Sequence, residues 1–118
     1  MNWTETQRQR RGHDFLPPAA DLARIPPHGA TGHFNTGDIP IHLHYTAGGS
    51  DWWIAELEED DDGQLSAYGY VRLAEYPAGS EWGTIWLHQL ERATFAGGLV
   101  IVERDLLWTP RTFSEVTR

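Results

Sequence analysis

The sequence predicts an α+β domain, in which a twisted antiparallel sheet of four to five strands carries one or two short helices on one face. Three observations lead to this fold class: a hairpin pattern in the middle of the chain, a strand with two-residue alternation just before it, and a helical spacing of apolar residues after it. With 118 residues, the chain has the length of one domain.

The hairpin pattern consists of two apolar-aromatic runs, Trp52–Glu58 and Gln64–Leu73, on either side of the acidic turn Asp60–Gly63. Aspartate tolerates turn geometry and glycine adopts positive φ, so this turn favours a chain reversal. Side chains alternate between the two faces of a strand. The runs therefore divide into one set, Trp53, Ala55, Leu57, Ala67, Gly69, Val71 and Leu73, and a second set, Trp52, Ile54, Glu56, Glu58, Tyr68, Tyr70 and Arg72.

The alternating strand is Ile39–Thr46, where apolar odd-numbered residues are separated by Pro40, His42 and His44. Pro40 cannot donate a backbone hydrogen bond, which favours a sheet edge at this end. The segment Ala47–Asp51 contains two glycines and makes the reversal into the hairpin. With the apolar residues of both strands on the core face, the expected cross-strand pairs are Tyr45 with Trp53, His44 with Ile54 and His42 with Glu56.

Further elements follow from proline, glycine and periodicity signals. The segment after Pro18 favours a short helix, and Gly97 ends a second helix with Leu87 and Leu90 on one face. The expected elements are a helix over Ala19–Arg24, a loop over 28–38, a strand over Glu81–Trp86, a helix over Leu87–Phe95 and a buried strand over Leu99–Leu107.

Charge divides the chain into a flexible basic arm, residues 1–14, and a single α+β domain, residues 15–118. Residues 1–11 carry three arginines and one glutamate, a net +2, so with a formal total of −8 the remainder carries −10. Clusters of like charge at a terminus also serve as interaction arms, and the sequence leaves both readings of this segment open.

Composition excludes several kinds of chemistry. There is no cysteine, hence no disulfide, thiol nucleophile or cysteine metal site. All nine basic residues are arginines, which excludes lysine Schiff bases and Walker-type phosphate loops. No apolar run reaches membrane-spanning length, so we expect no membrane association, and the absence of cysteine fits a cytoplasmic protein. Direct binding to nucleic acid is disfavoured because the acidic body would repel phosphates.

A binding surface is predicted on one side of the hairpin. Aromatic side chains with polar tips suit recognition, and the acidic turn would attract a basic partner. The residues assigned to this surface are Trp52, Glu56, Tyr68, Tyr70, Asp60, Asp61 and Asp62. The alternative is that a helix covers the aromatic rings and makes them core.

Two further clusters have both a chemical and a structural interpretation. His42, His44 and Glu56 could converge on one metal ion if the expected register holds, although such histidines are commonly exposed or bonded to a carboxylate. Glu103, Arg104 and Asp105 are interpreted as a structural ion pair, with Glu56 or Glu81 facing the arginine. A carboxylate pair for acid-base chemistry is the alternative.

Four stretches carry a family resemblance: residues 15–27, Trp52–Glu56 with the following acidic turn and Tyr68-Gly69, residues 81–91, and Val102–Leu106. In this order and spacing the chain resembles the domain of unknown function 2958 family, small proteins of bacterial plasmids, integrative elements and phages. Trp82 and Thr84 depart from the family pattern, as do the basic arm and the loop at 28–37. The resemblance implies a cytoplasmic accessory protein of mobile DNA and no established activity.

The residues and the resemblance together predict a small cytoplasmic protein-binding accessory factor of a mobile genetic element, which could inhibit a host defence or DNA-processing protein. No catalytic residue and no cofactor is predicted. Two alternatives stay open: a metal-dependent or acid-base enzyme using His42, His44 and Glu56, and an acidic mimic of nucleic acid built on the acidic turn.

Overall fold

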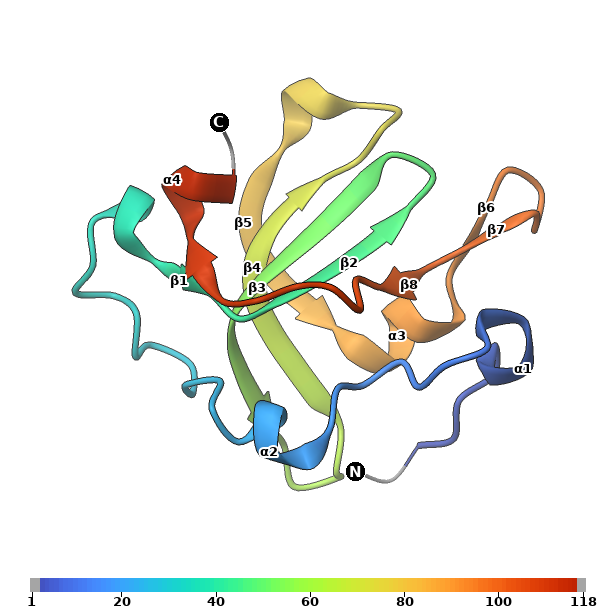
Figure 1. The fold of residues 1–118 in the computed structure, drawn as a ribbon, viewed down its shortest axis with the longest axis horizontal. Helices are drawn as coiled ribbons and strands as arrows, with labels where there is room; N and C mark the ends of the chain where they lie inside the picture. The colour runs from blue at the N-terminus through green and yellow to red at the C-terminus, as the bar shows by residue number, and fades with distance from the viewer. Residues whose placement is uncertain (1–2, 117–118) are drawn as a thin grey trace.

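The computed structural model describes residues 3–116 and confirms the α+β class (Figure 1). Its centre is a five-stranded antiparallel sheet with the spatial order β5-β4-β3-β2-β8. These strands are β2 (Leu43–Ala47), β3 (Ser50–Glu59), β4 (Leu65–Arg72), β5 (Glu81–Trp86) and β8 (Glu103–Arg104). Two small ribbons accompany the sheet: β1 (Pro40–Ile41) with β9 (Arg111–Thr112), and β6 (Thr94–Phe95) with β7 (Val100–Ile101).

The helices are short. Within residues 3–116 they are α1 (Arg8–Arg11), α2 (Ala19–Leu22), α3 (Leu87–Arg92) and α4 (Phe113–Val116), with the 3₁₀ turns η1 (Thr36–Asp38) and η2 (Pro77–Gly79). The helices expected after Pro18 and from Leu87 are present as α2 and α3, whereas α1 and α4 were not predicted. Over the described part of the chain, no helix has the length and apolar character needed to cross a membrane.

Two of the expected strands are interrupted. The run Ile39–Thr46 is divided at His42 into β1 and β2, which pair with different partners. The predicted continuous strand Leu99–Leu107 is wrong, because its first part pairs with β6 and its middle with β2. Beyond β8 the chain continues toward β9 without further strand structure up to Pro110, and Leu107 is 90% exposed.

The predicted register of the first hairpin is also wrong, by one residue. The observed pairs are Leu43 with Ile54, His44 with Trp53 and Tyr45 with Trp52. The reversal is a two-residue turn, Gly48-Gly49, and not the five-residue segment expected. Both glycines have positive φ, 52° and 90°, as a tight primed hairpin turn requires. The loop is three residues shorter than expected. Because three is an odd number, the side chains of β3 up to Ile54 lie on the opposite face from the one predicted relative to β2.

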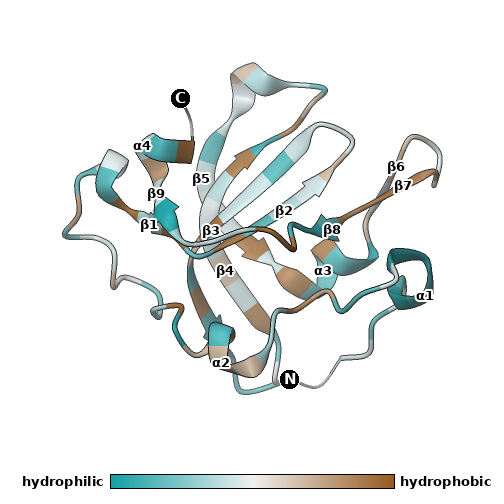
Figure 2. Cartoon of the chain, viewed as in Figure 1, coloured by the Kyte–Doolittle hydropathy of each residue, from teal (hydrophilic) through white to brown (hydrophobic). Residues whose placement is uncertain are grey.

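Both faces of the sheet are covered. The first face packs against α3 and the N-terminal segment, with Phe15, Tyr45, Trp52, Ile54 and Leu87 among its buried residues. The second face holds a smaller core of Ile39, Ile41, Trp53 and Ala55, against which the C-terminal residues Trp108, Phe113 and Val116 pack. Figure 2 shows apolar residues on the strands of the sheet, while α1 is hydrophilic. A sheet with two apolar faces explains why alternation alone did not identify the face of each strand.

Candidate functional site

Side chains on the second face of the sheet form three rows that run across β3, β4 and β5. Each row consists of residues that are directly opposite one another in the two ladders. The rows are Trp53–Tyr70–Trp82, Glu56–Tyr68–Thr84 and Glu58–Ser66–Trp86. Phe113 covers the first row, with its ring 4.9 Å from Tyr70 and 4.8 Å from Trp82. The middle row forms the floor of an open cleft.

We name this hollow the Glu56 cleft. It has a volume of about 490 Å³, a size that accommodates a side chain or a small ligand. Its lining residues are His28, Gly29, Thr31, Gly32, Phe34, Ile39, Glu56, Tyr68 and Thr84. Exposure increases along the floor, from buried Glu56 through half-buried Tyr68 to exposed Thr84. The cleft is therefore deepest at β3 and shallowest at the edge strand β5.

Glu56 connects the sheet to the loop that forms the opposite wall. Its two carboxylate oxygens accept hydrogen bonds from the backbone N–H of Gly29 and from the backbone N–H of Thr31, each at 2.9 Å. The hydroxyl of Thr31 also donates to Glu56, and the ring of His28 lies 3.7 Å from it. Burial by itself would raise the pKa of Glu56, but these donors outweigh it and lower the pKa below its ordinary value. The floor of the cleft therefore carries a negative charge at neutral pH.

A β-bulge turns Glu56 toward this face. The pairing of β3 with β4 shifts between Ile54 and Glu56, so that Ala55 and Glu56 both lie on the second face. Gly69 stands opposite the bulge, where an added Cβ would lie 2.0 Å from the carbonyl oxygen of Trp53. Only glycine permits this close approach of two backbones.

The acidic turn lies beside the cleft. Glu58 follows Glu56 on the same face, and its cross-strand neighbour Ser66 contacts His28 at 2.7 Å. Asp60 has a structural role, because its carboxylate accepts hydrogen bonds from the backbone N–H groups of Asp62 and Gln64. The predicted turn is confirmed: Gly63 completes the reversal with a positive φ of 79°.

The structure brings together some of the predicted surface residues and separates one. Glu56, Tyr68 and Tyr70 share the second face with the acidic turn. Trp52 lies on the other face, 5% exposed, and packs against Phe95 in the main core. Two features were missed: the true register places Trp52 opposite Tyr45 on the core face, and the bulge after Ile54 turns Glu56 to the other face.

The proposed metal cluster is not formed. His44 is opposite Trp53 and not next to Glu56, and His42 lines a separate pocket of about 290 Å³ with Arg24 and Asp105. Burial lowers the pKa of His42. Within residues 3–116 no group of three or more His, Asp or Glu side chains could hold a metal ion. The enzyme alternative built on these three residues is therefore not supported by their placement.

His44 instead belongs to an ionic cluster that the sequence did not predict. Its Nε2 contacts Asp51 at 2.8 Å and its Nδ1 contacts Asp105 at 2.9 Å. A carboxylate only accepts hydrogen bonds, so His44 must donate from both ring nitrogens for both contacts to be hydrogen bonds. Arg72 pairs with Asp51 from the other side, and the ring of Trp53 stacks on the imidazole at 5.4 Å. The two-residue glycine turn was the signal for this cluster, since the true register makes Asp51 a diagonal neighbour of His44.

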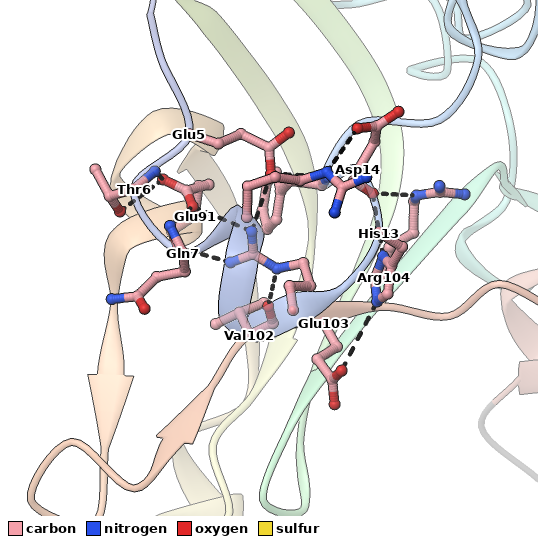
Figure 3. A network of polar contacts seen from close by, with 12 residues as sticks. Glu5, Thr6, Gln7, His13, Asp14, Glu91, Val102, Glu103 and Arg104 are labelled. Atoms are coloured by element: carbon pink, nitrogen blue, oxygen red, sulfur yellow. Dashed lines mark hydrogen bonds and ion pairs between the residues drawn. The ribbon is translucent and has the colours of Figure 1, made fainter.

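The residues Glu103, Arg104 and Asp105 find partners other than those expected. Arg104 donates from Nε to the carbonyl of Asp14 at 3.2 Å, and not to a carboxylate of the sheet. Glu103 lies 3.7 Å from the ring of His13 (Figure 3). Asp105 bonds to His44. The three residues thus attach the N-terminal segment and β2 to β8.

Arg11 is the centre of a second network that joins the N-terminal segment to the domain. Its partners Glu5, Glu91 and Val102 are labelled in Figure 3. Its guanidinium is completely buried and forms ion pairs with Glu5 and Glu91 at 3.0 and 3.1 Å. It also donates to the carbonyls of Val102 and Glu91. Glu91 accepts further hydrogen bonds from Thr6 and from the backbone of Gln7. Residues 3–14 are packed onto the domain, where composition predicted a separate arm.

Comparisons with models of known protein families, with curated proteins and with solved structures found no match to the chain. The resemblance to the domain of unknown function 2958 family stays a prediction. The candidate site is therefore described by its own geometry: an open aromatic cleft with an ionised carboxylate at its deep end and an acidic turn beside it.

Proposed function

We propose that this chain is a protein-binding domain that recognises a basic segment of a partner at the Glu56 cleft and the adjoining acidic turn. The observation that carries the proposal is the coincidence of three features on one face. These are a cleft with the aromatic walls Phe34 and Tyr68, an ionised carboxylate at its deep end, and the exposed acids Glu58–Asp62 at the end of β3 and in the acidic turn.

Each feature has a distinct role in binding. The aromatic rings supply contact area, since Phe34 is 39% exposed and Tyr68 is half-buried. The acids steer a basic segment toward the cleft and set its orientation. The net charge of −8 adds a long-range attraction for cationic partners and repels acidic ones.

The rigidity of the cleft also favours recognition. Three donors from the loop at 29–31 hold the Glu56 carboxylate, and Tyr68 stacks on Trp82 with ring planes inclined by 20°. A preformed site loses little conformational entropy on binding. If the family resemblance holds, the partner belongs to the cytoplasmic machinery that surrounds a mobile genetic element.

The test is a selection of peptides from a random displayed library against the intact protein, followed by affinity measurements on the enriched sequences by fluorescence polarisation. We expect enrichment of Lys and Arg and an affinity that falls as salt is raised. The variant Phe34→Ala should weaken binding at least about tenfold, whereas Tyr76→Ala, which removes an exposed ring outside the cleft, should not.

A charge variant separates steering from contact. Glu58→Gln/Asp61→Asn removes two exposed acids and leaves Asp60, which holds the turn. We expect slower association with little change in dissociation. Enriched peptides that carry no excess of basic residues, or that bind Phe34→Ala and the original protein equally well, would refute the proposal.

A further inference from the structure

Among the described residues, 3–116, the edge strand β5 forms the longest border of the sheet that pairs with no further strand (Figure 1). It runs over six residues, Glu81–Trp86, and within residues 3–116 its strand partner is β4 on one side. Natural edge strands are usually shortened, bulged or protected by charges and prolines. β5 pairs with β4 without a bulge, contains no proline, and carries a single charge at Glu81. Such an edge is a template for a further strand.

The opposite border of the sheet is different. β8 has two residues, Glu103–Arg104, and the N-terminal segment lies against it. Arg11 donates to the carbonyl of Val102, and Arg104 donates to the carbonyl of Asp14. One border is therefore short and covered by the chain itself, whereas the other is long and has no further strand beside it in the described part of the chain.

The backbone groups that β5 offers follow from the ladder. The N–H of Asp60 donates to the carbonyl of Gln64 at 2.9 Å, which marks a hydrogen-bonded pair at the hairpin end. Bonded and non-bonded pairs alternate along an antiparallel ladder, so even-numbered residues of β4 face β3 and odd-numbered residues face β5. The register of β4 with β5 then directs the N–H and C=O groups of Trp82, Thr84 and Trp86 away from the sheet.

The Glu56 cleft reaches this same border at Thr84. A strand added to β5 would lie about 4.8 Å beyond it, and its residue opposite Thr84 would project onto the second face. The ring of Tyr68 is then two strand spacings away, about 10 Å. A long side chain that leans over Thr84 meets this ring, with the carboxylate of Glu56 behind it. Arg and Lys have both the length and the charge for this position, and a cation over a tyrosine ring is attracted by it.

We propose that the partner segment adds to the sheet as an extended strand along β5 and places one Arg or Lys side chain over Thr84 and Tyr68 in the Glu56 cleft. This inference rests on the proposed function and names its binding mode. A second copy of the chain is a poor occupant, because β5 contributes no basic residue and each copy carries a net charge of −8.

The probe is the tightest basic peptide from the selection, synthesised with single N-methyl groups at each backbone position. In strand addition, methylation at alternate positions removes hydrogen bonds to β5 and should weaken binding about tenfold each, while the intervening positions stay unaffected. Replacing the one critical Arg or Lys by norleucine should cost a similar factor. Hydrogen exchange of the Trp82, Thr84 and Trp86 amides should slow when the peptide is bound, whereas the Gly83 and Ile85 amides, which face β4, should change little.

The protein itself provides a matched pair of variants. Thr84→Pro removes an outward N–H, and edge strands tolerate proline at such positions. Thr84→Val changes the side chain and keeps the N–H. We expect weakened binding for the proline variant alone. If it does not fold, the methyl scan and the exchange measurement decide.

The failure of this inference is distinguishable from that of the proposed function. Peptides that lose affinity for Phe34→Ala but tolerate every N-methyl group would overturn strand addition and leave cleft binding in place. A dimer in solution, with Thr84 protected from exchange before peptide is added, would overturn it in favour of a second copy. Equal binding to Phe34→Ala and the original protein would remove both.

Discussion

Replacement of Arg11 by methionine should destabilise the protein strongly, although the residue lies close to the N-terminus. Its guanidinium is 0% exposed and forms four polar contacts, with Glu5, with the Glu91 carboxylate, and with the carbonyls of Glu91 and Val102. Methionine fills much of the same volume without a donor. The change therefore leaves buried acceptors unpaired, while the volume of the site is largely preserved.

The magnitude follows from these contacts. Breaking a buried ion pair by removing one partner costs about 3–5 kcal/mol. The Glu91 carboxylate keeps its donors from Thr6 and Gln7, which reduces the loss. The two orphaned carbonyls add to it, at roughly 1 kcal/mol or more each. We expect the free energy of unfolding to fall by about 4 kcal/mol.

The assay is urea unfolding followed by tryptophan fluorescence, with Arg8→Met as the control from the same helix. Arg8 pairs with Asp14, but the two side chains are 48% and 72% exposed, so this variant should lose at most about 0.5 kcal/mol. Equal stabilities of the two variants, or a loss below about 1 kcal/mol for Arg11→Met, would show that residues 3–14 are not bonded into the domain.

Two further predictions concern acid sensitivity and the bulge. The pKa values of Glu56 and Glu91 lie below the ordinary 4.5, because hydrogen bonds outweigh the opposing effect of burial. The stability that these two carboxylates confer is therefore present above about pH 4.5 and is lost as the pH falls through their pKa values in the folded state. Urea midpoints should drop below that pH, and the profile of the Glu56→Gln/Glu91→Gln double variant should be flatter; parallel profiles would contradict this. Gly69→Ala should cost about 3 kcal/mol or prevent folding, because its Cβ would meet the Trp53 carbonyl, whereas Gly83→Ala has open space. Similar thermal midpoints for the two alanine variants would refute the steric argument.

Periodicity predicted β2, β3, β4 and β5 of the central sheet to within a few residues, because alternation and turn residues are local signals. The acidic turn was predicted for the same reason: Asp60 and Gly63 adopt in the structure the roles that their chemistry favours. The split of Leu99–Leu107 between two ribbons was not predictable, since the choice of pairing partner depends on distant parts of the chain.

The register was missed although its signal was present. Gly48-Gly49 is a strong two-residue turn, and accepting it would have placed His44, Asp51 and Trp53 on one face. The apolar residues on both faces concealed the error, because Trp52 and Trp53 are equally suited to burial.

The candidate site was predictable in part. Tyr68 and Glu56 were assigned to one surface from the hairpin, and they share it in the structure. The donors from Gly29 and Thr31 were not predictable, since a backbone N–H leaves no mark in the sequence. Glu91 had a weak signal, as it follows Leu87 by four residues and so lies on the buried side of its helix.

The bulge in β3 decides which side chain of the strand reaches the cleft. Beyond Ala55 the strand has advanced by one residue, so Glu56 leaves the side it would occupy in a regular strand and Leu57 replaces it there. If β3 kept all its residues and continued without the bulge, regular alternation would direct the carboxylate of Glu56 into the main core and the side chain of Leu57 into the cleft. The pairing of β3 with β4, and not only residue type, therefore decides whether this scaffold presents a charged recognition surface or an apolar one.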